Sequence, residues 1–258
     1  MRRKTRRMKP KGRPLVLRKG FWMFILALIV ACFVAYALFF SAFFRVQEIR
    51  VLGAETLSAD ALREKVVFRD IPFVPSTNIL LFDGEATVKG IEETFPKVRE
   101  VRVRRIFPST IKIQAVERRE SLVWCQSQCF AVDETGIAFE EREGPGALTA
   151  YKEGGEAELR QRVLSPESIS SVLQFSESIE GVPEVREAGI TLPSFKVLSE
   201  ETVIALTSEG WEIYLSLQED AAWQTAKFGA VFQRELTAER RKALEYVDVR
   251  FGDQAYVK

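Results

Sequence analysis

The sequence predicts an α+β protein made of a basic tail, a single transmembrane helix and a large region of mixed strands and helices. Residues 21–44 run for twenty-four positions without one Asp, Glu, Lys or Arg. Residues 45–120 show the patterns of a strand, two helices and two further strands, in that order. Residues 121–258 then alternate short strand patterns with amphipathic helices, which predicts a β-rich distal domain with flanking helices.

The apolar segment 21–44 has the length and composition of a membrane span. At about 1.5 Å per residue such a helix rises roughly 36 Å, enough to cross a hydrocarbon core of about 30 Å with some tilt. Lipid offers no hydrogen bonds to an open backbone, so a segment that crosses it must be helical. We therefore expect residues 21–44 to lie in membrane lipid.

The tail, residues 1–20, sets the expected sidedness of this span. It holds ten Lys and Arg residues and no acidic residue, and dense positive charge beside a span stays in the cytoplasm. This predicts a single-pass protein of the cytoplasmic membrane, with the C-terminal region outside. The alternative is a cleaved signal peptide, since Ala35-Tyr36-Ala37 fits the small-x-small rule. Because apolar residues continue from Leu38 to Phe44, the anchor is preferred.

The region after the tail is mildly acidic, with 27 basic against 36 acidic residues. That balance argues against nucleic acid as a partner. The sequence has no histidine, which removes His-based triads, His metal ligands and the commonest general base. No Gly-rich phosphate loop follows a strand, and no carboxylate pair stands out. The sequence therefore predicts no enzymatic activity, no cofactor, no metal and no small-molecule substrate.

Three cysteines are present. Cys32 lies in the apolar segment and is expected to act as a small apolar residue. Cys125 and Cys129 flank Gln-Ser-Gln between two strand patterns, which is the spacing of a three-residue hairpin loop. Outside the cytoplasm this pair is a possible disulfide, and two free thiols are the alternative.

The segment after the span is predicted to form five elements joined by turns that contain Pro or Gly. A strand pattern ends at Gly53, and Ser58 is placed as the N-cap of a helix that continues to Val67. The predicted elements are strand 46–52, helix 59–67, helix 85–95, strand 98–106 and strand 110–117.

Several stretches of this region resemble a POTRA domain. They are the Asn-Ile-Leu-Leu-Phe-Asp stretch at 78–83, the run Arg105 to Ile113 around Phe107-Pro108, and the closing Val116 to Arg119. One such domain placed directly after one N-terminal span resembles the layout of the FtsQ/DivIB bacterial cell-division proteins.

The distal region adds to this resemblance. Residues 131–139 are similar to the family's strand-turn-strand motif, in which Asp133 and Gly136 supply the turn. Predicted elements follow: a helix capped by Ser165, a strand over 190–197, a hairpin of 203–207 with 211–217, and a helix after Asp220. We expect Trp124, Trp211 and Trp223 in the core. Residues 244–252 alternate as a half-buried strand and look like the family's closing strand.

The resemblance implies a scaffold of the divisome at the division septum. It also implies binding of FtsB/DivIC-type and FtsL-type membrane proteins by β-augmentation at the C-terminal strand. The residues carried over are Val247, Asp248, Val249, Arg250, Phe251 and, near the end, Tyr256. On this interpretation Arg250 pairs with an acidic partner residue, while Phe251 or Tyr256 fills a pocket. The alternatives are that Val249 and Phe251 are ordinary core and that Arg250 forms a local ion pair.

Two other functions remain as alternatives. A POTRA-bearing component of an envelope transport or assembly machine is the first, and it predicts further POTRA repeats or a barrel. A membrane-tethered hydrolase is the second, and it predicts a hydrolysis product that a single nucleophile substitution abolishes.

Overall fold

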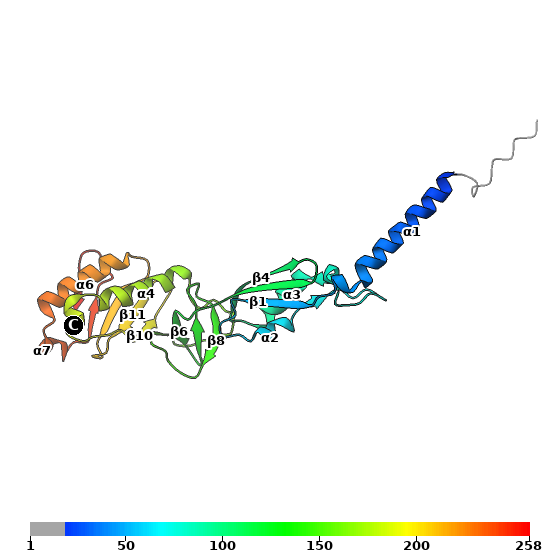
Figure 1. Cartoon of the computed structure of the whole chain (residues 1–258). Coiled ribbons are helices and arrows are strands. Elements are labelled where there is room, and N and C mark those ends of the chain that lie inside the picture. Colours follow the sequence, from blue (N-terminus) through cyan, green and yellow to red (C-terminus); the bar gives the residue numbers. More distant parts are fainter. Residues whose placement is uncertain (1–18) are drawn as a thin grey trace, which may run out of the picture. The chain divides into compact units, whose positions relative to one another are not determined.

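The computed structural model describes residues 19–258 and confirms the predicted α+β class (Figure 1). The predicted basic tail lies outside the described residues except for its last two positions. The chain divides into two compact units. The first contains the residues up to Ile91 together with Val101–Ala115, and the second contains Glu92–Glu100 together with Val116–Lys258.

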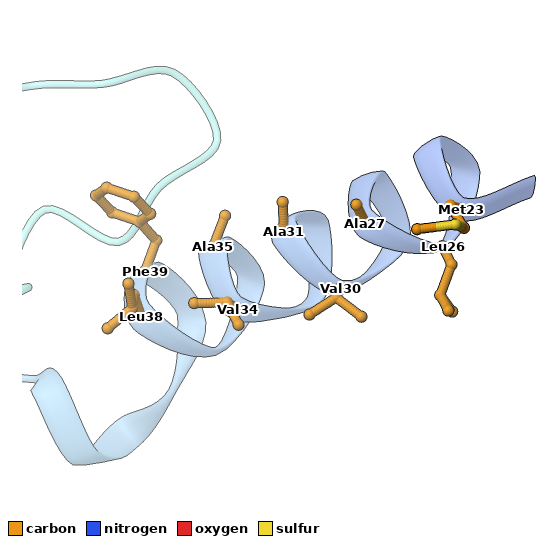
Figure 2. Close-up of a pocket in the computed structure, with 9 residues that line it drawn as sticks. All are labelled: Met23, Leu26, Ala27, Val30, Ala31, Val34, Ala35, Leu38 and Phe39. Atoms are coloured by element: carbon orange, nitrogen blue, oxygen red, sulfur yellow. The ribbon is translucent and has the colours of Figure 1, made fainter. Parts of the chain in front are cut away.

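The first helix, α1, covers Lys19–Phe40 and has none of its residues buried. It is long and apolar enough to cross a membrane. Figure 2 shows Ala27, Ala31 and Ala35 along one line of the helix and larger aliphatic side chains along a neighbouring line. The helix ends four residues before the predicted Phe44, because the Ser41 side chain accepts from the Phe43 N–H and starts a separate 3-10 turn, Ala42–Phe44.

Most of the three-stranded sheet, in the order β1-β5-β4 with β1 parallel to β5, belongs to the first unit, and residues 98–100 and 116–117 at its strand ends fall in the second. The helix predicted to reach Val67 ends at Arg63, because the Val67 N–H donates to the Thr87 hydroxyl and residues 67–68 pair with 82–83. The elements are β1 (Glu48–Leu52), α2 (Ala59–Arg63), β2 (Val67–Phe68), η3 (Ile79–Leu81), β3 (Phe82–Asp83), α3 (Gly84–Thr94), β4 (Val98–Ile106) and β5 (Thr110–Glu117).

The turn after β1 requires glycine. Gly53 has φ +80°, and a Cβ built on it would lie 2.1 Å from the Ala115 carbonyl oxygen. Because a side chain cannot fit there and φ is positive, only glycine allows the chain to pass so close to β5.

The second unit is built on a nine-stranded sheet in the order β14-β13-β12-β11-β10-β9-β6-β7-β8. Its parallel neighbours are β10 with β9, β6 with β9, and β12 with β13. The strands are β6 (Leu122–Cys125), β7 (Cys129–Val132), β8 (Ala138–Arg142), β9 (Thr149–Tyr151), β10 (Ser194–Val197), β11 (Thr202–Leu206), β12 (Glu212–Ser216), β13 (Tyr246–Asp248) and β14 (Tyr256–Val257).

Helices cover one face of this sheet. In Figure 1, α4 (Pro166–Glu180) and α6 (Ala221–Glu235) lie on the same side of β10 and β11. One hydrophobic core joins them to the sheet and includes Phe175, Phe228 and Val203. Two short helices, α5 (Pro183–Glu187) and α7 (Ala238–Arg241), complete the unit.

Two of the three tryptophans expected in the core are there. Trp124 and Trp211 are buried, whereas Trp223 is exposed. Trp223 lies in the first turn of α6, whose buried positions are Ala221, Thr225 and Phe228 among others. At the helical period of 3.6 residues, the side chain two positions after Ala221 turns away from the sheet.

The hairpin of β6 and β7 carries a disulfide. Cys125 and Cys129 face each other in the strand register and their sulfurs are bonded, with the Cα atoms 4.1 Å apart. Cys32 is a free thiol on α1.

The turn after β7 is organised by a buried carboxylate. Asp133 Oδ1 accepts from the Thr135 N–H at 2.9 Å, the Thr135 hydroxyl at 2.7 Å and the Ile137 N–H at 3.1 Å. Arg118 pairs with Oδ2. Burial by itself raises the pKa of Asp133, but the hydrogen bonds from Thr135, Ile137 and Arg118 outweigh it and hold the pKa below its ordinary value. Gly136, with φ +79°, completes the turn.

This network predicts a loss of stability in acid. The folded-state pKa of Asp133 lies below the unfolded value of about 3.9. The contribution of Asp133 is therefore present above that pH and is lost as pH falls through the folded-state pKa. Asp133→Asn is expected to lower the free energy of unfolding at neutral pH by about 3 kcal/mol, because it leaves Arg118 without its charge partner.

The measurement is urea unfolding at several pH values, followed by the fluorescence of the buried tryptophans. The Asn variant should show a smaller decrease between neutral and acid pH than the unsubstituted chain. Glu141→Gln, which changes an exposed carboxylate on β8, serves as the control. Equal acid sensitivity of Asp133→Asn and the unsubstituted chain would exclude this role of Asp133.

Candidate partner-binding surface

The predicted terminal strand lies inside the sheet rather than at its edge. Strand β13 contains only Tyr246–Asp248 and lies between β12 and β14. The expectation that residues 247–251 form one edge strand is therefore wrong. The chain turns at 251–254, where Gly252 has φ +43° and the Gln254 N–H donates to the Phe251 carbonyl at 3.1 Å. It then returns antiparallel as β14, which forms the edge.

Helix α6 holds this turn in place. The side chain of Lys227 is buried, and its Nζ donates to the carbonyl of Gly252 at 2.6 Å. An ammonium group buried at this point needs such a partner. Through this hydrogen bond, α6 fixes the turn that precedes β14.

The register of β14 determines which of its backbone groups face outward. Tyr246 and Lys258 exchange both backbone hydrogen bonds, at 3.2 and 3.1 Å. Val257 pairs with Val247 and Tyr256 pairs with Asp248. Hydrogen-bonded and non-hydrogen-bonded pairs alternate along antiparallel strands. Hence Val257 belongs to a non-hydrogen-bonded pair, and its N–H and C=O point away from β13.

A cluster of aromatic side chains and one arginine lies beside this edge, on the sheet face opposite α4 and α6. The Arg250 guanidinium stacks over the rings of Tyr214 and Phe251, at 5.1 and 5.0 Å from their centroids. Tyr214 contacts Tyr246 at 5.3 Å between centroids, and Phe251 contacts Tyr256 at 6.1 Å. We call Tyr214, Tyr246, Arg250, Phe251 and Tyr256 the aromatic cluster.

An ion pair fixes the arginine of this cluster. Arg250 donates to Asp248 from Nε at 2.9 Å and from Nη2 at 2.6 Å, and the Asp248 residue is 7% exposed. The bond to Asp248 raises the pKa of Arg250. Burial raises the pKa of Tyr214, and its hydrogen bond with Glu212 acts in the same direction. The charged guanidinium and the neutral phenol are therefore the stable forms at neutral pH.

The six residues carried over from the resemblance have three different environments. Val247 and Val249 are fully buried in the core, so they position the strand. Asp248 is enclosed in its ion pair and Arg250 is partly buried. Phe251 and Tyr256 are 53% and 51% exposed.

These placements bear on the alternatives that the sequence left open. Val249 is ordinary core, and Arg250 forms a local ion pair with Asp248. The alternative that Phe251 is ordinary core is wrong, because the strand has ended at Asp248 and the ring is exposed. Sequence reasoning also missed Tyr214, Tyr246 and Val257. The alternation of Glu212, Tyr214 and Ser216 with buried Ile213 and Leu215 is the signal that identifies the outward face of β12.

Among residues 19–258 there is no group of three or more Cys, Asp or Glu side chains placed to hold a metal ion. The arrangement at the end of the sheet offers outward backbone groups, exposed aromatic rings and a fixed arginine. Such a surface is suited to binding a peptide segment.

Comparison with known proteins shows which proteins this chain resembles. Residues 44–118 match the model of the POTRA domain of FtsQ type. Cell division protein FtsQ of Chloroflexus aurantiacus is 32% identical over 132 residues, covering 51% of this chain and 46% of that protein. FtsQ of Syntrophotalea carbinolica is 30% identical over 173 residues, covering 62% and 59%. FtsQ of Chloroflexus aggregans is 31% identical over 113 residues, covering 43% and 39%.

Residues 44–118 are thus similar to the POTRA domain of FtsQ type, and three curated FtsQ proteins match parts of this chain. The predicted resemblance is thereby confirmed, and so is the POTRA domain, whose match covers the elements from β1 to β5. The chain spans about half the length of the curated FtsQ relatives that it matches.

The ion pair in the aromatic cluster predicts that Arg250 and Phe251 respond differently to substitution. Arg250→Glu places a second carboxylate beside Asp248 and is expected to lower the free energy of unfolding by about 3 kcal/mol. Phe251→Ser removes an exposed ring and is expected to change it by less than about 1 kcal/mol.

Chemical denaturation followed by tryptophan fluorescence measures both changes. Arg240→Glu is the matched control, because Arg240 pairs with Glu235 where both side chains are half exposed, and such pairs contribute about 1 kcal/mol or less. If Arg250→Glu were as stable as Arg240→Glu, the ion pair would not support the end of the sheet.

Proposed function

We propose that the chain is a single-pass membrane scaffold of the bacterial divisome and has no catalytic activity. The observation that carries this proposal is the combination of an FtsQ-type POTRA domain with an apolar helix directly before it. Two relatives match over 132 and 173 residues, more than the 44–118 match of that domain, and both are named cell division proteins. In this proposal the N-terminus lies in the cytoplasm, both folded units lie outside, and the protein gathers at the septum.

The proposed partners are division proteins of the FtsB/DivIC and FtsL types, which join the sheet at β14. A partner strand beside β14 would bond to the outward N–H and C=O of Val257. Backbone hydrogen bonds then provide affinity, and alternate side chains provide selectivity. Adding one strand to an open edge satisfies groups that are otherwise left to water.

The aromatic cluster supports the same site. Exposed Phe251 and Tyr256 flank the edge, and aromatic and arginine residues supply most binding energy in protein interfaces. Arg250 donates to Asp248 from Nε and Nη2. Its Nη1 group therefore stays available to a carboxylate of the partner, and an acidic residue is expected opposite it.

The division role is tested in cells depleted of their own FtsQ. A fluorescent protein is fused to the N-terminus of this chain, and both localisation and cell length are recorded. The proposal predicts a band at mid-cell and rescue of filamentous growth. Uniform membrane fluorescence with continued filamentation would exclude the division role and favour an envelope transport or assembly component.

The edge of the sheet is tested with two substitutions at one position. Val257→Pro removes an N–H that the fold does not use, which an edge strand tolerates. Val257→Ala keeps that N–H and shortens the side chain. Loss of one backbone hydrogen bond, about 1.5 kcal/mol, corresponds to roughly tenfold weaker binding.

The measurement is isothermal titration of the purified chain with the extracytoplasmic segment of an FtsB/DivIC-type and FtsL-type pair. Val257→Pro should weaken binding about tenfold more than Val257→Ala. Phe251→Ser should weaken binding as well, whereas Trp223→Ala, an equally exposed aromatic on α6, should leave it unchanged. Equal affinities of the Pro and Ala variants would remove β14 from the interface without affecting the localisation test.

A further inference from the structure

The loop before η3 exposes its largest side chain almost completely. Phe73 is 95% exposed, the highest value among the large apolar side chains of the described residues, and its neighbour Ile71 is also exposed. Phe73 has φ +68°, a conformation that bulky residues rarely adopt. Phe73 and Ile71 together form an exposed apolar tip, and exposed apolar patches mark surfaces that contact membrane or protein.

Hydrogen bonds fasten this loop to the end of α1. Asn78 is buried, and its Nδ2 donates to the carbonyls of Leu38 and Phe39 at 2.9 and 3.0 Å. These carbonyls belong to the last turn of α1, which has no helical donors for them. Figure 2 shows the Leu38 and Phe39 end of the helix with a segment of the chain passing beside it. The loop therefore lies beside the C-terminal end of α1, at the same height along the helix axis.

The length of α1 indicates where its C-terminal end and this loop lie relative to the bilayer. Its 22 residues rise about 33 Å, against a hydrocarbon core of about 30 Å. The turn around Phe39 and Phe40 then lies at the outer boundary of the hydrocarbon. Phe73 is five residues from Asn78, and the turn bonds Val74 N–H to Ile71 and Asn78 N–H to Pro75 shorten the path. The ring is within reach of the headgroup layer.

A second exposed apolar turn is hydrogen-bonded to the segment that follows α1. The Gln47 N–H donates to the Ser109 carbonyl at 2.9 Å, which holds the turn between β4 and β5 against the segment that leaves α1. This turn carries Ile106 and Phe107, both exposed. Exposed Arg45 and Arg104 lie in the same two segments, and Asp70 is the acidic residue of the loop. Apolar tips with neighbouring arginines suit the boundary between acyl chains and anionic headgroups.

We propose that the POTRA domain rests on the outer surface of the membrane, with Phe73 and Phe107 inserted at the lipid interface. This inference depends on the membrane span in the proposed function. The occupant of the two apolar turns is lipid, because they are fixed to the end of the helix that crosses the bilayer. The contact would limit the tilt of the POTRA domain on its span and so orient the folded region that it carries.

Site-directed spin labelling of the full chain in nanodiscs tests this proposal. The discs contain phosphatidylcholine and phosphatidylglycerol, and nitroxides are attached to single cysteines at positions 73, 107 or 52 in a Cys32→Ala background. The disulfide of Cys125 and Cys129 leaves no thiol to react there. Leu52 is the matched control, because it is an exposed apolar residue at the far end of β1, about 20 Å from Arg45 along the strand.

Accessibility to oxygen, which concentrates in lipid, is compared with accessibility to a water-soluble nickel complex. Labels at 73 and 107 are expected to favour oxygen, and the label at 52 is expected to favour nickel. Nickel accessibility at 73 and 107 equal to that at 52 would overturn the proposal and assign these turns to a protein contact or to water. A label on native Cys32 reports the span itself: if it favours nickel, the span and this inference both fail, and if it favours oxygen, the inference is judged on 73 and 107 alone.

Discussion

In the second unit, α4 and α6 pack on one face of the nine-stranded sheet. This arrangement determines which kinds of side chain are found on the other face. Side chains such as Val203, Ile213 and Val247 pack beneath α4 and α6, so their strand neighbours must point the opposite way. On β12 and at the end of β13, the residues on that other face combine apolar area with polar atoms. Tyr214, Tyr246 and Arg250 are such residues, and they come together because β12 and β13 are adjacent and parallel.

The same constraint explains why the aromatic cluster is rigid. Val247 and Val249 are held in the core, which forces Asp248 onto the outer face between them. A carboxylate that is largely buried there needs a cation, and Arg250 supplies it two residues later. The guanidinium is then trapped between two rings. A side chain already fixed in the free protein loses less entropy on binding, so the ion pair that stabilises the sheet end would also favour binding of the proposed partner.

Local patterns predicted the elements whose signals lie within the element itself. Strand 110–117 alternates over most of its length, and strand 98–106 alternates around Val101 and Val103; the bounds of both agree with the structure. Helix α4 begins as predicted at the Ser165 cap, with Pro166 at its first position. Pairing across distant segments decided the rest. Strand β9 lies in the Gly-rich stretch 144–155, which has little residue pattern of its own, and it is a strand because β6 and β10 flank it. In the candidate site, the end of β13 and the existence of β14 depend on the turn at Gly252 and on Lys227, which lies on α6. No periodic pattern in the sequence predicts the turn at Gly252 or its hydrogen bond with Lys227.

The two edges of the sheet are not equivalent, and this favours β14 as the place where a partner strand joins. At the other edge, β8 carries Glu140, Glu141 and Arg142 in succession, and two of these are in ion pairs, with Lys97 and Glu120. The segment 160–162 also bonds to the start of β8, through Ala138 in both directions. Charges and a covering segment are the means by which natural sheets block pairing at an edge. Strand β14 has neither a run of charges nor, within the described chain, a segment on its outer side. Short edge strands resist edge-to-edge aggregation. The turn held by Lys227 fixes the outward groups of β14, as the proposed strand addition requires.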